Sequence, residues 1–445
     1  MAPSGAEKRV AIIGGGIAGL AVAYYLGKAG LSVDLYEAEA ETGGLARSFD
    51  FDGLRVERYY HFICLPDHEL IGLARELGLG EQLVWRRTRT SFFYQGRLYP
   101  FTSPLDLARF SPIPFRSRLN LGLQTLKWQN RRDWRELDEI PARQWLIEHL
   151  GERTYEVVWS PLLEMKFGEA HDRVSAAWIW HRVHRVANSR RTPLHPQVMG
   201  HFRGGTETLL LRLRERIAGQ GGRIFLRTPA EAVVARDGRV SAVRIAGEER
   251  PYAAAVLAVP LAQAAALLPA EMADYRPKLE QVAFLGVVCL ALALDRGVTD
   301  SFWCNIHDDR IPFNGVIEMS RLNPETGRGG GFVYVPYYLP VTSPRFSFSD
   351  ERIFEEAIQA FPLLQPGLDR GAVRGYWVFR SRLAQAVCTT GFLRIQPPQE
   401  LPLPGLFLVE STQQYPSDRT ISGMIGLAEQ VSRLVVAHLR RNGRP

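Results

Sequence analysis

A glycine-rich turn between two apolar segments constrains this chain more than any other feature. The apolar run 10–13 predicts a buried parallel strand, and the pattern from Leu20 onward predicts a helix. The run 31–36 predicts a second strand, which ends directly before Glu37. The glycines of the turn, at the spacing GxGxxG, are Gly14, Gly16 and Gly19. This order of strand, glycine turn, helix, strand and acidic residue predicts a unit that binds a dinucleotide.

Each residue type in this unit has a physical role. Gly14 permits the tight turn, Gly16 lets a pyrophosphate approach the backbone, and Gly19 lets the helix pack on the strand. The amides at the helix N-terminus then face the phosphates, and Glu37 can accept hydrogen bonds from a ribose diol. A turn that is merely rich in glycine does not explain Glu37.

A second pair of glycines favours FAD over NAD. Gly43 and Gly44 follow the acidic residue, and Arg47 comes three residues later. In this pattern the sequence resembles the superfamily of flavin amine oxidases, protoporphyrinogen oxidases and phytoene desaturases. The resemblance implies that the glycine pair contacts the FAD pyrophosphate and that Arg47 lies nearby. The basic residue of the family directly follows the pair, where this chain has Leu45.

The resemblance recurs in the middle and at the end of the chain. The segment 202–217 is similar to a glycine pair of the family that opens a helix. A later strand resembles the one whose backbone, at about Val233, holds the adenine end of FAD. In the segment 405–431, Glu410 matches the acidic position that binds the ribityl chain. The residues that open the last helix are Ser422, Gly423 and Met424. The resemblance implies that the first amides of this helix face the pyrimidine carbonyl of the flavin.

These blocks predict an α/β chain, α+β overall, with a Rossmann-like doubly wound FAD-binding domain and an inserted substrate domain of antiparallel sheet plus a helical cap. We expect the FAD-binding domain to comprise residues 1–85, 196–270 and 385–445, and the substrate-binding domain to comprise residues 86–195 and 271–384. The first insertion is aromatic, basic and helical in pattern, whereas the second contains strand-like runs. No second GxGxxG unit occurs, so a dedicated NAD(P)H domain is not expected.

Three residues are candidates for catalysis or substrate binding. His61 lies in a stretch that passes near the isoalloxazine ring in related flavoproteins, and a hydrogen-bonded structural histidine is the alternative. Lys166 ends a hydrophobic helix, where it would pair with a substrate anion or stabilise the helix C-terminus. Arg380, like the adjacent Arg382, would hold an anion near the ring or form a surface ion pair. The four cysteines have no CxxC spacing, and we expect no metal site.

An aromatic strand and a missing lysine bear on the substrate. The aromatic residues of this strand are Phe332, Tyr334, Tyr337 and Tyr338. They are expected to fill the core or to line a pocket for a planar or apolar substrate. Amine oxidases of the superfamily carry a lysine near the flavin N5 on a central strand of the substrate domain. The corresponding run 284–294 has none, which argues against amine oxidation.

The resemblance implies an FAD-dependent oxidoreductase that removes a hydride from an organic substrate held against the isoalloxazine ring, as in protoporphyrinogen oxidases or desaturases. Oxygen or a quinone is expected to reoxidise the flavin. A non-redox flavin isomerase resembling UDP-galactopyranose mutase is one alternative. A non-catalytic binding protein, similar to the escort proteins of prenylated GTPases, is the other.

A local excess of positive charge suggests which partners this protein binds. The net charge is +7, yet the segment 86–135 alone holds eleven basic residues against two acidic ones, interleaved with aromatic residues. This pattern favours an anionic substrate or an anionic membrane surface, and a solvated basic face with inward aromatic residues is the alternative. No nucleic-acid-binding motif accompanies the charge. No apolar run is long enough to span a bilayer, so we expect a cytoplasmic protein, with peripheral contact at the inner membrane surface as a further expectation.

Overall fold

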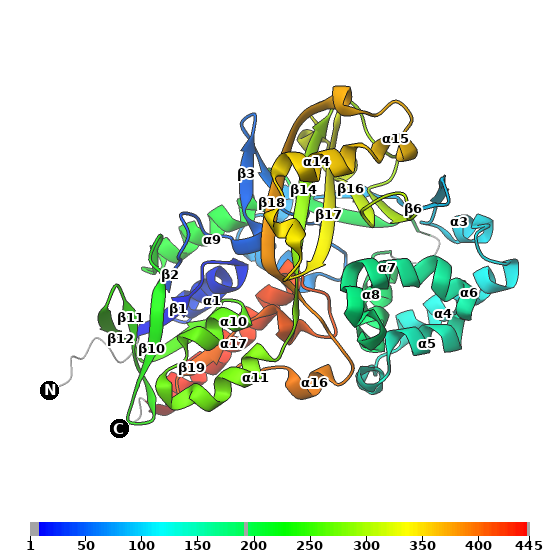
Figure 1. Cartoon of the computed structure of the whole chain (residues 1–445). Coiled ribbons are helices and arrows are strands. Elements are labelled where there is room, and N and C mark those ends of the chain that lie inside the picture. Colours follow the sequence, from blue (N-terminus) through cyan, green and yellow to red (C-terminus); the bar gives the residue numbers. More distant parts are fainter. Residues whose placement is uncertain (1–8, 191–194, 443–445) are drawn as a thin grey trace.

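The computed structural model describes residues 9–190 and 195–442. Its elements gather into three parts, which are a parallel sheet with its helices, a larger mixed sheet, and a group of helices beside the mixed sheet (Figure 1). Helices and strands alternate in the first part and are mixed in the other two. The fold is therefore α/β with a second, inserted sheet, which confirms the predicted fold class.

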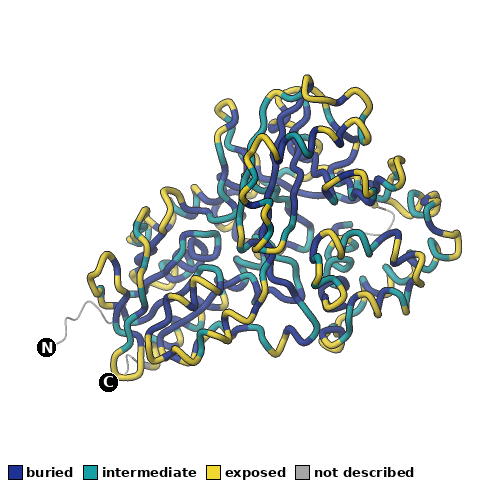
Figure 2. Tube along the Cα trace, in the orientation of Figure 1, coloured by how far each residue is buried: buried dark blue, intermediate teal, exposed yellow. Residues whose placement is uncertain are grey.

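A five-stranded parallel sheet forms the first part. Its strand order is β19 (Leu406–Leu408), β13 (Ala254–Leu257), β1 (Arg9–Ile13), β2 (Ser32–Tyr36) and β9 (Arg223–Phe225). The central strands are buried on both faces, which is why their sequences are nearly continuous apolar runs (Figure 2). Because side chains alternate along a strand, Val10 and Ile12 pack on one face, and Ala11 and Ile13 pack on the other.

Helices cover one face of this sheet and a small sheet covers the other. On the Val10 face, α1 (Ile17–Lys28) packs against α9 (Glu207–Gly219) and α17 (Ile421–Asn442). The Ala11 face packs with α10 (Leu261–Leu267) and a three-stranded antiparallel sheet. The strands of that sheet are β10 (Ala230–Arg236), β11 (Arg239–Ile245) and β12 (Glu248–Pro251). The sheet is therefore wound on both faces.

The second part is a seven-stranded sheet. Its strand order is β18 (Val373–Ala386), β14 (Phe284–Leu294), β17 (Gly331–Pro340), β16 (Gly315–Glu318), β15 (Trp303–His307), β6 (Thr90–Tyr94) and β7 (Arg97–Pro100). Neighbouring strands are antiparallel, except that β15 and β6 are parallel. The first predicted insertion therefore contributes two strands as well as helices. One face of the sheet packs against α14 (Asp350–Ile358).

The third part is a cap of helices that lies beside the mixed sheet (Figure 1). Its members are α3 (Pro104–Arg109), α4 (Phe115–Asn130), α5 (Ala142–Leu150), α6 (Glu152–Thr154), α7 (Ser160–Phe167) and α8 (Ala176–Ala187). The sequence sets two of these helix starts. Ser103 and Asp106 form a capping box around Pro104 at the start of α3, and the Ser175 side chain caps α8.

The remaining helices and strands are short. They are the hairpin β3 (Ser48–Phe51) and β4 (Leu54–Glu57), the pair β5 (Leu83–Arg87) and β8 (Val198–Phe202), and the helices α2 (His68–Glu76), α11 (Arg276–Glu280), α12 (Met319–Leu322), α13 (Pro324–Gly327), α15 (Phe361–Leu364) and α16 (Phe392–Ile395). The strands of the parallel sheet come from within the three segments expected to form the FAD-binding domain, whose boundaries stay a prediction. In the part of the chain that the structure describes, no helix has the length and apolarity to cross a bilayer.

Candidate active site

The glycine turn after β1 has a backbone that only glycine fits at two positions. Gly14 has a φ of +105°, and a Cβ there would lie 2.4 Å from the carbonyl oxygen of Ala258 on the neighbouring connection. A Cβ on Gly19 would lie 1.9 Å from the carbonyl oxygen of Gly14, so α1 packs directly on the turn. A Cβ on Gly16 would meet only the Cα of Gly44, at 4.0 Å. Open space therefore lies beside Gly16, at the N-terminus of α1.

The second glycine pair closes on the first. The Gly43 amide donates to the carbonyl oxygen of Gly15 at 2.7 Å, and Gly43 has a φ of +119°. Glu37, which is 9% exposed, accepts hydrogen bonds from the amides of Gly15 at 2.7 Å and Glu39 at 2.9 Å. Tertiary structure thus brings together three predicted groups, the GxGxxG turn, the acidic residue and the second glycine pair. Gly16 and Gly43, one from each turn, both line the cavity described below.

Arg47 and Val233 are placed differently from these glycines. The Arg47 Nε donates to the Gly44 carbonyl oxygen at 3.2 Å, and its Nη1 lies 3.5 Å from a carboxylate oxygen of Glu39. Val233 is buried on β10, opposite Val243 of β11. Neither residue lines the large cavity described below, and the same holds for five other predicted FAD residues, Gly14, Gly19, Glu37, Gly44 and Gly423.

The C-terminal motif meets the same region. Glu410 accepts hydrogen bonds from the Ser411 hydroxyl and the Thr412 amide, each at 2.7 Å. The Ser422 hydroxyl donates to Glu69, which ties α17 to α2. The Gly423 amide donates to the Thr420 hydroxyl.

In the described part of the chain, the amides left free at the start of α17 lie one or two residues before Gly423 and Met424. The amides of Gly423 and Met424 are bonded within the chain, the first to the Thr420 hydroxyl and the second to the Thr420 carbonyl. Among the described residues, the amides of Ile421 and Ser422 have no such acceptor. The first amides of a helix lack intrahelical acceptors, and the Thr420 hydroxyl caps the third one here.

A cavity of about 920 Å³ joins these motifs to the mixed sheet and the cap. Its wall includes Gly16, Gly43, Glu410, Ser422 and Met424 at the glycine turns and helix α17. The wall continues over β14, β17 and β15 and ends at α3 and α4. Such a volume is at the upper end of ligand sites, which suits a cofactor and a substrate together.

Several polar atoms in this wall lack partners. They are His61 Nδ1, Trp159 Nε1, His181 Nδ1, His201 Nε2 and Arg419 Nη1. Buried polar atoms are nearly always hydrogen-bonded in native proteins. The residues present therefore fit a cofactor and a substrate that carry acceptors and donors of their own.

His61 lines the cavity, as its predicted role near a bound ligand requires. It lies beside Tyr59 and Tyr60 in the wall. Burial, and secondarily the positive charge of Arg419, lowers the pKa of His61 to about 4. The imidazole is therefore neutral near pH 7.

Lys166 also faces the cavity. Its Nζ lies 3.7 Å from Asp418 Oδ2 and 4.8 Å from the ring centres of both Trp178 and Tyr338. Burial lowers the pKa of Lys166 to about 8, although the carboxylate of Asp418 opposes this shift. Of the two roles considered for Lys166, a place in the ligand wall fits this position.

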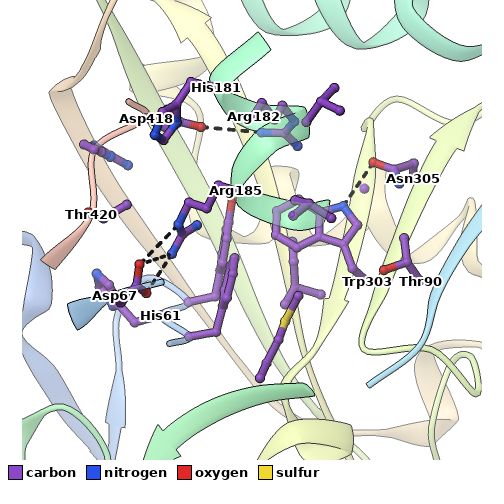
Figure 3. Close-up of a pocket in the computed structure, with 18 of the residues that line it drawn as sticks. His61, Asp67, Thr90, His181, Arg182, Arg185, Trp303, Asn305, Asp418 and Thr420 are labelled. Atoms are coloured by element: carbon purple, nitrogen blue, oxygen red, sulfur yellow. Dashed lines mark hydrogen bonds and ion pairs between the residues drawn. The ribbon is translucent and has the colours of Figure 1, made fainter. Parts of the chain in front are cut away.

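Helix α8 adds cations that sequence reasoning missed. Arg182 donates from Nη1 to the same Asp418 oxygen at 3.4 Å, and Arg185 forms a two-pronged pair with Asp67 at 2.9 Å (Figure 3). His181 lies beside them on the same helix. The signal in the sequence was the cluster of basic residues within 181–185 on a strongly amphipathic helix. A second signal was the acidic Asp418, which precedes the last helix.

Arg380 is not in the cavity, which corrects its candidacy for catalysis. It pairs with Val288 across β18 and β14, and Val288 packs on the α14 face. There the guanidinium donates to Asp350 at 2.7 Å and to the Phe348 carbonyl. Arg382 lies nearby and donates to the Val341 carbonyl. Strand register decides this, because alternate residues point to opposite faces.

The same alternation divides the aromatic strand. Tyr338 lines the cavity and shares a hydrogen bond with Tyr60 at 3.1 Å. Tyr334 and Phe332 are fully buried in the core, and Tyr337 packs on the α14 face. Pocket lining is therefore the role of one residue only, and core packing is the role of the rest.

Strand β14, where the resemblance to amine oxidases led us to look for a lysine, contains none. The residues of β14 in the cavity wall are Val287 and Cys289. Lys28, Lys127 and Lys278 are not among the lining residues, so Lys166 is the cavity's lysine among those described. It comes from the cap and not from the sheet.

At the cap, the cavity wall reaches the protein surface. Phe115, Leu119, Leu123 and Leu126 of α4 line the cavity and are also 42–66% exposed. The aromatic residues Phe92, Phe93, Phe110 and Trp128 are buried instead. The apolar part of this basic segment is thus made mainly of leucines and not of the aromatic residues that the sequence suggested.

The geometry defines the class of protein. This chain has a dinucleotide-binding fold with a glycine turn, an acidic residue after the second strand, and an inserted sheet over a large cavity. Comparison with known proteins then gives the family. The family model described as "Flavin containing amine oxidoreductase" matches residues 17–417. The chain belongs to this family, and it is an FAD-dependent oxidoreductase.

Individual relatives are distant. A 15-cis-phytoene desaturase from Synechococcus elongatus is 25% identical over 94% of this chain and 93% of its own length. A mitochondrial protoporphyrinogen oxidase from Nicotiana tabacum is 28% identical, over 39% of this chain and only 37% of that enzyme. A crystal structure of reduced UDP-galactopyranose mutase has a TM-score of 0.74 at 15% identity, covering 97% of this chain and 96% of that one. That likeness shows the fold alone, so the mutase alternative is not favoured.

Proposed function

We propose that this protein removes a hydride from an organic substrate held in the cavity and that oxygen or a quinone reoxidises its FAD. One observation carries the proposal: the two glycine turns lie together at one end of a cavity of about 920 Å³ that continues past His61 and Tyr338 to the cap. FAD supplies the two-electron chemistry when bound. The chain binds the substrate, orients it and excludes water from the site.

The residues that we propose to hold FAD are Gly14, Gly16, Gly19, Glu37, Gly43, Gly44, Arg47, Val233, Glu410, Ser422, Gly423 and Met424. Glu37 has lone pairs left for a ribose diol, since only two amides occupy its carboxylate. Gly423 and Met424 are proposed to act by shaping the helix start. The unpaired amides of Ile421 and Ser422 are then the donors available to the flavin.

The wall favours a substrate with large apolar or planar parts. Phe62, Trp303 and Tyr338 present aromatic surface, and Val287 of the central strand β14 adds apolar surface. Relatives whose names specify porphyrinogens or 15-cis-phytoene support a substrate of this kind. The absence of lysine from β14 weighs against an amine, even though the family is named for amines.

Anaerobic reduction of the bound flavin tests the proposal. The purified holoprotein is mixed with a panel of porphyrinogens, polyenes, amines and nucleotide sugars, and the visible flavin absorbance is followed. We expect a porphyrinogen or polyene to bleach the flavin. Isomerisation of a nucleotide sugar without net oxidation of any panel member would contradict the proposal.

We propose further that the cavity mouth rests on an anionic lipid bilayer. Phe115, Leu119, Leu123 and Leu126 recur at helical spacing on one stripe of α4 and are exposed there. The segment 107–132 carries six basic residues and no acidic one, so the surroundings of this stripe complement an anionic surface. A substrate dissolved in the bilayer would then enter the cavity without crossing water.

Vesicle cosedimentation tests this contact. We expect binding to vesicles with anionic phosphatidylglycerol at low salt, weaker binding at high salt, and little binding to neutral phosphatidylcholine vesicles. The matched control for a substituted stripe is Leu211, which is 48% exposed on α9 and away from the cavity lining. Equal binding by the stripe variant and the wild type would exclude the mouth as the contact.

A further inference from the structure

The ammonium group of Lys166 sits in an aromatic box in the cavity wall. Its Nζ lies 4.8 Å from the ring centres of Trp178 and Tyr338 and 5.8 Å from that of Phe167. Among the described residues, its nearest acidic oxygen is Asp418 Oδ2 at 3.7 Å, which is too long for a hydrogen bond. The ammonium is thus buried with its donors largely unused.

One carboxylate serves two cations at this place. Arg182 also reaches Asp418 Oδ2, at 3.4 Å, while Gln385 donates to the other oxygen, Oδ1, at 2.7 Å. The lone carboxylate of Asp418 therefore faces Lys166, Arg182 and a neutral amide. One positive charge remains uncompensated, and both cations lie beside aromatic rings.

The other charged groups of the wall do not cancel this excess, because the lining residues include six Lys or Arg against four Asp or Glu, with Glu57 and Glu410 among the acidic ones. Arg185 is matched by Asp67 in a two-pronged pair, so that arginine is already neutralised (Figure 3). Arg419, next in sequence to Asp418, adds a further cation whose Nη1 is buried without a hydrogen-bond partner. An excess of buried positive charge is costly unless a ligand neutralises it.

We propose that Lys166 and Arg182 form a binding site for an oxyanion, a carboxylate or phosphate group, carried by the substrate of this enzyme. This inference rests on the proposed function and names the substrate class. The anion would lie in the cavity between α7, α8 and the loop of Asp418, with an apolar remainder extending along the aromatic wall. A protonated amine would meet like charge at the same place, which adds a reason to expect a non-amine substrate.

Titration calorimetry of the FAD-loaded protein tests the site with four probes. They are octyl phosphate, octan-1-ol, octylamine and inorganic phosphate. We expect octyl phosphate to bind at least about tenfold more tightly than octanol, since hydrogen bonds to charged groups exceed neutral ones in strength. Octylamine should bind most weakly. Octanol that binds as tightly as octyl phosphate would overturn the proposal.

Inorganic phosphate distinguishes the two sources of such an anion. Weak binding of inorganic phosphate, beside tight binding of octyl phosphate, identifies an anionic group on an apolar molecule. Equal binding of the two still supports the oxyanion site and assigns it to a free small anion, which overturns its attribution to the substrate.

Three substitutions should change the affinity for octyl phosphate, two of them lowering it and one raising it. Lys166→Met and Arg182→Met should each remove most of the preference for octyl phosphate over octanol. Asp418→Asn should increase the affinity for octyl phosphate, because it removes the carboxylate that competes for both cations. A merely structural role for Asp418 predicts a loss instead. Lys278→Met, at an exposed lysine, is the matched control and should change nothing.

The flavin spectrum separates this inference from the proposed function. If Lys166→Met keeps its FAD and yet retains the full preference for octyl phosphate, the oxyanion site is wrong and the flavin assignment stands. If the wild type holds no FAD, the proposed function fails, and calorimetry on that protein still decides the oxyanion site.

Discussion

The two ends of the cavity are built in different ways. At the glycine turns the ligand surface is backbone, and the turn that opens it is contiguous in sequence, from Gly14 to Gly19. At the cap the surface is side chains that converge from distant segments, with Lys166 and Arg182 meeting at Asp418. Under the proposed function, backbone at the first end would hold a cofactor of fixed shape, whereas side chains at the second end would hold the substrate.

If the two ends act separately, a change at the glycine turn should remove FAD and spare the fold. Gly16 has an ordinary φ and open space beside it, so Gly16→Val should leave the apoprotein folded while filling the room beside the turn. We expect loss of at least about two orders of magnitude in FAD affinity, measured by fluorescence titration of apoprotein, because the backbone could no longer approach the pyrophosphate.

A matched control for this change is Gly72→Val, where an added Cβ meets nothing within 4 Å on α2. Its FAD affinity and melting temperature should equal those of the wild type. Full FAD occupancy in the Gly16 variant would break the assignment of this end of the cavity.

A smaller loss is expected at the acidic residue of the same end. Glu37→Gln keeps the shape of the side chain and removes the charge that accepts from the Gly15 and Glu39 amides. We expect FAD affinity to fall roughly tenfold, in line with a weakened charge-assisted hydrogen bond. Equilibrium dialysis measures it. An unchanged affinity would mean that Glu37 serves the turn alone and does not contact the ribose.

Substitutions at the cap should weaken binding to membranes and leave FAD binding unchanged. The double change Leu119→Glu and Leu123→Glu places two carboxylates on the exposed stripe of α4. We expect binding to phosphatidylglycerol vesicles to drop by about tenfold or more, since apolar burial is lost and like charges meet. The Leu211→Glu control should bind as the wild type does, and both variants should keep their flavin. Cosedimentation measures the binding to vesicles, and the visible spectrum measures the flavin content.

The smallest expected effect is a pH dependence at the cap end. Lys166, whose pKa is lowered to about 8, faces Asp418, Arg182, Arg419 and Cys388. An anion binds the protonated form better, so affinity should be highest below pH 8 and fall as pH rises through and above that value. Octane-1-sulfonate, whose charge is constant in this range, should lose several-fold in affinity between pH 7 and pH 9. The Lys166→Met variant should show a flat profile over the same range in calorimetry.

The sequence was enough to predict the glycine turn and its acidic residue because the information for them is local, while their contacts with FAD stay a prediction. A glycine at a positive φ, a helix start and an acidic residue after a strand are each set by neighbouring residues, so their spacing predicts the unit. Side-chain alternation along a strand also puts Val10 and Ala11 on opposite faces of the sheet, whereas the order of the strands became known only from the structure. The family resemblance rested on these local blocks.

Only the tertiary structure decided the cap end. The register between β14 and β18 put Arg380 on the α14 face and left the cavity to Val287 and Cys289. Packing of α7 and α8 against the loop before α17 brought Lys166 and Arg182 to Asp418. The packing of α4 left Phe115 and three leucines exposed and buried Trp128. The reason is physical: a backbone turn is determined by adjacent residues, whereas the meeting of side chains from remote segments depends on strand register and helix packing, which one sequence does not display.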